Sequence, residues 1–389
     1  MNGVISGRHY RTGLPLEVHV NGGVIEAVHT LAESPHMADW PWLAPGLVDL
    51  QVNGGWGLDL NTLPLKPETV AGLSRRLLAR GVTSYCPTLI TNGPDPLAQA
   101  ASAIAEAVRT LPDIAGQIAG IHLEGPFLSP EDGPRGAHPL EHICPPDWEA
   151  FCRWQEAAGG LIRIITVSPE WPGAAAFISR CSASGVRVSI GHTAASPEQI
   201  RQAVAAGAVM STHLGNGTHL TLPRHPHYLW EQLAADELYG CMIADGCHLP
   251  DSLLKVILRV KQSRAILVSD AVSLSGMAPG AYRLHIGGDV VLTPEGRLHL
   301  AGHPQLLAGS AMMLADQVTY LARAGLVPLE DALDCASLHP ARLLELPQAA
   351  GLTAGAPADL IGFRKISGGD LELQAVWKNG RLAAAGKEW

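Results

Sequence analysis

The stretch VRVSIGHTAASPEQIRQAVAAGAVMSTHLGNG, residues 186–217, contains two short apolar runs of β type separated by a helical pattern. Ser196 followed by Pro197 has the form of a helix N-cap and a first helical residue. Each apolar run is followed closely by a histidine, His192 in the first case and His213 in the second. Strand, helix and strand in this order form the repeating unit of a parallel sheet. The stretch therefore predicts a β-α-β unit whose two strand ends carry imidazoles.

The same alternation continues through the middle of the chain. Helical patterns such as those at 68–80, 96–111 and 196–207 lie between strand-like runs. Because there are eight such runs, they favour a closed parallel barrel over an open sheet. The runs are LVDLQV (47–52), TSYCPTLI (83–90), IAGIHLEG (118–125), LIRIITVS (161–168), VRVSIGH (186–192), AVMSTHL (208–214), LYGCMIAD (238–245) and AILVSDA (265–271).

The two ends of the chain have a different style. Residues 1–43 alternate short β-type runs with turns rich in Gly and Asn, and residues 355–389 repeat this style around a hairpin turn at Asn379-Gly380. A barrel of this kind uses roughly 250 residues, and the chain has 389. The sequence predicts an α/β protein, with a (β/α)8 TIM-like barrel over 44–354 and a small β-sandwich domain built from both chain ends.

Composition excludes several classes of function. The 27 Lys and Arg residues are scattered and the formal net charge is −9, so nucleic acid is not an expected partner. Seven cysteines without a CxxC pair argue against a disulfide framework. No apolar run is long enough for a membrane span, and the N-terminus does not resemble a targeting peptide. Neither GxSxG nor a phosphate-binding glycine loop occurs. We expect a cytoplasmic enzyme that binds neither membrane nor nucleic acid.

Four polar residues, Glu124, His192, His213 and Asp270, lie one each at the ends of separate runs. The strand ends of a barrel meet at one face, so these side chains are expected to converge. Two imidazoles and one carboxylate suit a catalytic zinc site, which keeps one position open for water. The first three are therefore predicted to hold one divalent metal ion, zinc above all, with Fe²⁺ or another divalent ion as the alternative. Asp270 is predicted to act as the acid and base beside it.

The alternative interpretation is that each of these residues is only a hydrogen-bonded polar group near a strand end. This interpretation can account for any one of these residues taken alone. It accounts less well for three potential ligands at successive strand ends. Two further histidines, His248 in MIADGCH and His138 in PRGAHP, are candidate donors to a developing oxyanion. Each could equally be a loop histidine that the backbone satisfies. His248 is the stronger candidate because it follows the seventh run directly.

Nine short motifs are spread over most of the chain and are followed by the segment GLTAGAPADL. They are APGLVDLQVNGG (44–55), HLEGPF (122–127), GAHP (136–139), SIGHT (189–193), THLGN (212–216), ADGCH (244–248), LVSDA (267–271), LAGSAMML (307–314) and SLHPARLL (337–344). In this order they resemble the N-acetylglucosamine-6-phosphate deacetylases of the amidohydrolase superfamily. The resemblance implies a metal-dependent hydrolase that removes the acetyl group of a small N-acetyl amino sugar, N-acetylglucosamine 6-phosphate or a close analogue, and that forms a homodimer.

The resemblance also implies roles for individual residues. Glu124, His192 and His213 would be metal ligands, Asp270 the general base and then the acid, His248 the donor that polarises the carbonyl, and His138 a substrate contact. Asn216 and Gly217 are further expected substrate contacts, since a glycine-rich GNG stretch lets the backbone approach a ligand.

One departure from the wider superfamily lies at the first predicted strand. Many amidohydrolases have His-x-His there, which helps to hold a second metal, whereas this chain has Gln51, Val52 and Asn53. A side-chain amide is a neutral and weak metal ligand, so one metal is expected rather than two. Gln51 is predicted instead to orient the water or the substrate carbonyl.

A second departure follows the sixth run. The family usually reads HLYNAM and then a His-x-x-Arg-x-Pro segment, whose arginine binds the sugar phosphate, often across a dimer. This chain reads HLGNGTHLTLPRHPHYLWEQL (213–233), in which Arg224 is the nearest arginine and the expected substrate contact. The change leaves open a related amidohydrolase acting on a different N-acyl amine, phosphorylated or not, or on a cyclic amide. A non-catalytic barrel protein is the third alternative. An insertion-like segment at 298–305 is expected to reshape one pocket wall.

Overall fold

The central sheet of the protein is a ring of eight parallel strands. A computed structural model of the chain describes residues 2–284, 288–366 and 370–385. The strands, in their hydrogen-bonded order, are β5 (Leu47–Val52), β8 (Val82–Ile90), β9 (Ile121–Glu124), β10 (Ile162–Val167), β11 (Arg187–Ile190), β12 (Ala208–Ser211), β13 (Tyr239–Met242) and β14 (Ala265–Leu267). Each lies within or overlaps one of the eight predicted runs, so the predicted parallel barrel is confirmed.

The ring closes between its first and last strands. Val52 of β5 forms a parallel bridge with Ala271, just beyond β14. The Asp270 backbone N–H donates to the Gln51 carbonyl at 3.0 Å. All six residues of β5 are buried, as expected for a strand with packed side chains on both faces. Closure therefore places Gln51 beside Asp270 although they are far apart in the sequence.

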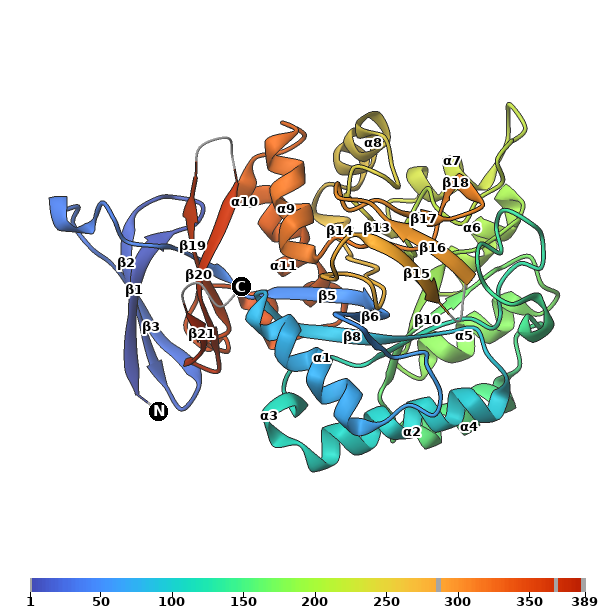
Figure 1. The fold of residues 1–389 in the computed structure, drawn as a ribbon, viewed down its shortest axis with the longest axis horizontal. Coiled ribbons are helices and arrows are strands. Elements are labelled where there is room, and N and C mark those ends of the chain that lie inside the picture. The colour runs from blue at the N-terminus through green and yellow to red at the C-terminus, as the bar shows by residue number, and fades with distance from the viewer. Residues whose placement is uncertain (1, 285–287, 367–369, 386–389) are drawn as a thin grey trace.

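Helices alternate with these strands and surround the barrel (Figure 1). The predicted N-cap is confirmed: the Ser196 hydroxyl accepts the Gln199 N–H at 3.3 Å, and the Gln199 side chain accepts the Ser196 N–H at 2.7 Å. The α-helices are α1 (Pro67–Ala79), α2 (Pro94–Thr110), α3 (Pro112–Ala115), α4 (Trp148–Ala157), α5 (Ala174–Ala183), α6 (Pro197–Ala205), α7 (Tyr228–Ala234), α8 (Asp251–Lys261), α9 (Leu314–Arg323), α10 (Leu329–Cys335) and α11 (Leu338–Leu343).

Strands from both chain ends join in one unit, as predicted, and they form a seven-stranded mixed sheet (Figure 1, left). Its strands in order are β21 (Arg381–Ala385), β20 (Leu371–Lys378), β19 (Leu360–Lys365), β4 (Trp42–Pro45), β1 (Gly3–His9), β2 (Pro15–Asn21) and β3 (Val24–Thr30). The sheet curls, since Val24 bridges to Pro357. Asn379 and Gly380 form the predicted hairpin turn with φ of 49° and 69°. The domain boundaries at 43/44 and 354/355 stay a prediction. Residues 367–369 and 386–389 of the predicted C-terminal segment lie outside the described residues.

A third sheet lies between β14 and α9. Its four antiparallel strands are β15 (Gly280–Leu284), β16 (Gly288–Leu292), β17 (Leu298–Leu300) and β18 (His303–Leu307). It buries a small core of its own, made by Leu274, Val290, Leu292 and Leu298. The insertion-like segment 298–305 spans β17 and the first half of β18. This sheet was not predicted from the sequence.

The cysteines and the helices of the structure bear on two expectations from composition, the absence of disulfides and of membrane spans. All seven cysteines lie within the described residues and all have free thiols, so the expected absence of disulfides holds there. None of the helices in the described part of the chain has the length and apolar character needed to cross a membrane.

Candidate metal centre

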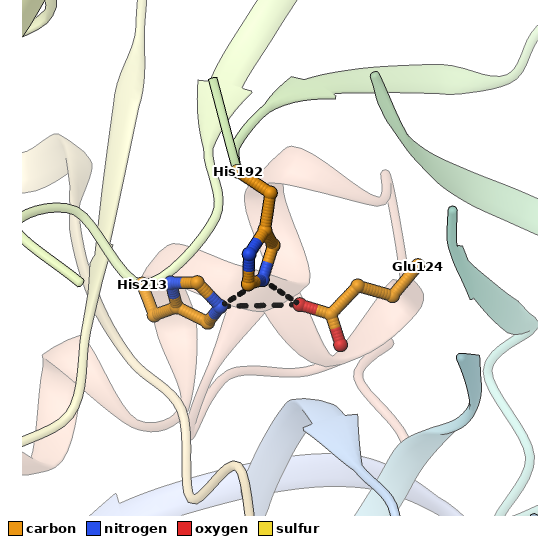
Figure 2. Close-up of side chains that lie close together, drawn as sticks. All are labelled: Glu124, His192 and His213. Carbon is orange, nitrogen blue, oxygen red and sulfur yellow. Dashed lines mark hydrogen bonds and ion pairs between the residues drawn. The ribbon is translucent and has the colours of Figure 1, made fainter. Parts of the chain in front are cut away.

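Three predicted ligands converge at the C-terminal ends of barrel strands. Glu124 is the last residue of β9, while His192 and His213 follow β11 and β12 by two residues. His213 Nε2 lies 3.1 Å from Glu124 Oε1 and 3.0 Å from His192 Nε2, and His192 Nε2 lies 3.3 Å from the same oxygen. Figure 2 shows the three side chains pointing at one another. The described residues thus contain a buried group of three potential ligand atoms within 4.8 Å of one another.

The hydrogen bonds around these atoms favour a cation. His192 Nδ1 lies 2.8 Å from the Pro134 carbonyl, which can only accept, so Nδ1 donates this hydrogen bond and Nε2 is the nitrogen that faces Glu124 and His213. Burial acts to raise the pKa of Glu124, but the hydrogen bonds from His192 and His213 hold it well below its usual range. An ionised carboxylate and imidazole nitrogens facing one point are a donor set that fits a divalent metal ion.

The backbone at the site is strained. His192, His213 and Asp270 have backbone φ angles of 48°, 25° and 47°. These values lie in the left-handed region, which residues other than glycine rarely adopt. Each such residue costs roughly 1–3 kcal/mol and persists only where its surroundings fix it, and such residues cluster at functional sites. This backbone strain is typical of a functional site, where the direction of the side chains is maintained at a cost in folding stability.

Asp270 lies beside the three ligands and is held by two amides. Asn53 Nδ2 donates to Asp270 Oδ1 at 2.8 Å, and Gln51 Nε2 donates to the same oxygen at 3.1 Å. The Gln51 amide also donates to Glu124 Oε1 at 2.8 Å. Burial, followed by the charge of Glu124, raises the pKa of Asp270 to about 7. A carboxyl with that pKa can both accept and release a proton near neutral pH.

His248 forms a close pair with Asp245. The Nδ1–H of His248 donates to Asp245 Oδ2 at 2.6 Å, and Asp245 Oδ1 accepts the backbone N–H groups of Cys247 and His248. Burial acts to raise the pKa of Asp245, yet the hydrogen bond from His248 holds it below its ordinary value. The hydrogen bond to Asp245 fixes the orientation of the His248 ring and leaves Nε2 as the ring nitrogen that Asp245 does not engage.

His138 lies against His192 at the same site. Its Nε2 is 3.3 Å from His192 Nε2, and its Nδ1 is 2.9 Å from the Thr91 hydroxyl. Burial, with the nearby His192, lowers the pKa of His138 to about 3. His138 is therefore a neutral imidazole at physiological pH.

A cavity of about 520 Å³ opens onto these groups. Glu124, His192, His213, Asp270 and His248 all line it, as do the predicted substrate contacts His138, Asn216 and Gly217. Asn216 Nδ2 is buried and has no hydrogen-bond partner among the described residues, so it is available to a ligand. Gln51 does not line the cavity and lies between the two carboxylates. Arg224 is exposed and does not line the cavity of its own chain, so its contact with substrate stays a prediction.

Comparisons with known proteins identify the family. Residues 42–383 match the model of the amidohydrolase family. The N-acetylglucosamine-6-phosphate deacetylase of Homo sapiens is 34% identical over 351 residues, covering 87% of this chain and 83% of the human protein. That of Bacillus subtilis (strain 168) is 33% identical over 350 residues, covering 89% and 85%. The chain belongs to the N-acetylglucosamine-6-phosphate deacetylase family of amidohydrolases.

A solved structure of the same family has the same fold. It is a mutant of the Mycobacterium smegmatis deacetylase in complex with N-acetyl-D-glucosamine-6-phosphate, with a TM-score of 0.86 and 31% sequence identity. The match covers 99% of this chain and 100% of the other. The resemblance read from the sequence motifs is therefore confirmed for the family.

Sequence reasoning missed several residues of this deacetylase site. Asn53 holds Asp270, Thr91 orients His138, and Asp245 orients His248. A signal existed for two of them. Asn53 lies two residues after Gln51 and so shares its face of an extended strand. Asp245 stands three residues before His248 in ADGCH. Arg297 and Gln305, which line the cavity from the four-stranded sheet, were also missed.

Gly217 provides a test of how closely the His192 ring is held. A Cβ at Gly217 would lie 2.8 Å from His192 Nδ1, and the residue has a φ of 58°. We expect Gly217→Ala to displace the ring and to weaken metal affinity about 10- to 100-fold. Competition with a chelator, followed by metal analysis, measures this. Gly185→Ala is the matched control, since Gly185 has a φ of 85° and nothing within 4 Å of a Cβ. Equal affinities in the two variants would contradict the expectation.

Proposed function

We propose that this protein is a metal-dependent deacetylase that hydrolyses the acetamide of N-acetylglucosamine 6-phosphate. The observation that carries the proposal is the convergence of Glu124, His192 and His213 on one point, beside Asp270, in a chain of the deacetylase family. A non-catalytic barrel protein would not be expected to keep strained histidines beside a carboxyl such as Asp270, because the strain lowers stability without any gain in function.

Glu124, His192 and His213 would hold one divalent metal ion, for which we propose zinc. Bound there, the ion supplies a Lewis acid that polarises the amide carbonyl and lowers the pKa of water. Gln51 and Asn53 occupy the strand position where many amidohydrolases carry two histidines. Both of their amides donate to carboxylate oxygens, which supports a single-metal site.

Asp270 accepts a proton from the attacking water in this proposal and later delivers it to the departing amine. The amides of Gln51 and Asn53 hold its Oδ1, which leaves Oδ2 for the proton. His248, oriented by its hydrogen bond to Asp245, would donate a hydrogen bond to the carbonyl oxygen as negative charge develops there. The products are acetate and an amino sugar.

His138, Asn216 and Gly217 are the proposed substrate contacts on the cavity wall, with Arg224 as a contact that a second subunit would supply. The homodimer and the cytoplasmic location stay predictions from the sequence. Light scattering of the purified chain tests the first of them.

Acetate release from a panel of amides tests the function. The panel contains N-acetylglucosamine 6-phosphate, N-acetylglucosamine, another N-acylated amine and a cyclic amide, each assayed with added Zn²⁺ and with Fe²⁺. We expect the highest kcat/KM for the phosphorylated sugar. Faster hydrolysis of a different amide would instead support the second candidate, a related amidohydrolase, which the position of Arg224 outside the cavity favours.

Gln51 is expected to act by positioning Asp270 rather than by contacting substrate. Gln51→Met keeps the size of the side chain but removes the amide that joins Glu124 to Asp270. We expect kcat to fall about 10- to 100-fold, by analogy with other partners that orient site residues, while KM changes little. Gln117→Met is the control, because Gln117 is equally buried but donates to the Asp113 carbonyl in α3. A rise in KM with an unchanged kcat would indicate a substrate contact instead.

A further inference from the structure

The cavity contains one cation that the residue roles above leave unused. Arg297 lines it from the position just before β17, and it is the only Lys or Arg among the lining residues that the structure describes. Its partly buried guanidinium donates to the Pro304 carbonyl at 3.0 Å. Within residues 2–284, 288–366 and 370–385, no carboxylate forms an ion pair with it. A guanidinium has five N–H donors, so most of them remain available to a ligand.

The backbone around Arg297 is fixed on both sides. Its carbonyl accepts the Thr293 N–H at 2.9 Å, and its own N–H donates to the Thr293 hydroxyl at 3.2 Å. These bonds close the turn between β16 and β17, while the bond to Pro304 ties the side chain to β18. The guanidinium is thus held in place before any ligand binds, and less conformational entropy is lost on binding.

The charges of the cavity show why a cation is needed for an anionic substrate. Glu124, Asp270 and Asp59 all line it and would repel a phosphate group. The other arginines near the site do not offset this repulsion. Arg135 pairs with Asp132, and Arg224 is exposed outside the cavity.

We propose that Arg297 binds the phosphate group of the substrate and determines the preference for a phosphorylated sugar. This inference rests on the proposed deacetylase function. A guanidinium can form two parallel, charge-assisted hydrogen bonds to a phosphate. Gln305 of β18 lines the same wall and offers a neutral donor beside it. The four-stranded sheet therefore contributes to phosphate recognition from within the chain itself.

Paired assays of four proteins test this inference. The wild type, Arg297→Gln, Arg224→Gln and Arg283→Gln are compared for kcat/KM on N-acetylglucosamine 6-phosphate and on N-acetylglucosamine. Arg283 is the matched control because it is an exposed arginine of β15 in the same sheet and does not line the cavity. We expect Arg297→Gln to lower kcat/KM for the phosphorylated sugar about 10- to 100-fold and to leave the other sugar within about twofold.

Calorimetry separates this inference from the proposed function. Glucosamine 6-phosphate and glucosamine are titrated into the same four metal-loaded proteins, so turnover is not required. We expect the wild type to bind the phosphorylated sugar more tightly, and Arg297→Gln to lose that difference. If the wild type released no acetate from either sugar, the proposed function would fail while this binding result still tested Arg297. An Arg297→Gln variant that matched Arg283→Gln, or a loss confined to Arg224→Gln, would overturn the inference.

Discussion

Asp270→Asn is expected to lower kcat about 10²- to 10⁴-fold, the usual contribution of a general base. The substitution keeps the shape of the side chain and an oxygen that can accept from Asn53, but it removes the group that takes the proton. The protein should still fold and still bind its metal. Acetate release measures kcat, and metal analysis of the same sample measures occupancy.

Two comparisons make this result specific to the proton transfer. Asp316→Asn removes a carboxylate of α9 that pairs with Arg80, remote from the cavity, and should leave kcat unchanged. Asp270→Asn that retained more than about a tenth of the wild-type kcat with full metal occupancy would remove Asp270 from the role of base.

His213→Gln is expected to abolish both metal binding and turnover. The His213 imidazole contacts both of the other proposed ligands, and its loss leaves only two donors, fewer than a catalytic zinc site uses. We expect a loss of about a thousandfold or more in kcat/KM, comparable to that on chelation of the wild-type protein. Excess Zn²⁺ should restore the chelated wild type but not the variant.

The matched control for His213→Gln is His339→Gln. His339 is also buried, but its Nδ1 donates to the Ala265 carbonyl and it lies outside the cavity. This change should lower thermal stability without lowering the metal content of the folded protein. If both variants kept their metal, Glu124 and His192 would be sufficient, or the ion would bind elsewhere.

The barrel and the residues at its strand ends were predictable because one rule links them. Apolar runs become buried parallel strands, and the residues that follow them meet at one face whatever their separation in sequence. Glu124, His192, His213 and Asp270 followed from that rule alone. The rule does not say which atoms contact each other. The Gln51 amide donates to both Glu124 and Asp270 because the barrel closes between β5 and β14. The pattern of strands along the sequence does not predict the distances that this closure creates.

The four-stranded sheet of β15 to β18 could not be predicted from the sequence. Its strands are three to five residues long and mostly exposed or half-buried, so their alternation is too short to stand out from loop sequence. The residues TPEGR, 293–297, do contain a turn pattern between two such runs, and Arg297 ends it. Arg224 was favoured instead because it lies near the family's usual phosphate-binding segment. The contact of Arg224 with substrate stays a prediction, whereas the position of Arg297 on the cavity wall could not be predicted because the fold, not local sequence, builds that wall.

The join between the two chain ends has a consequence for synthesis on the ribosome. β4 pairs with β19 in a register that sets Pro45 opposite Leu360, so the sheet lacks its β19–β21 side until the chain has been synthesised past Leu360. At roughly 5–20 residues per second, β1 to β4 wait for tens of seconds with an unpaired edge. Nascent chains stalled before β19 should therefore expose the unpaired edge of β4, and deletion of β19 should leave the same edge open to pairing with another chain.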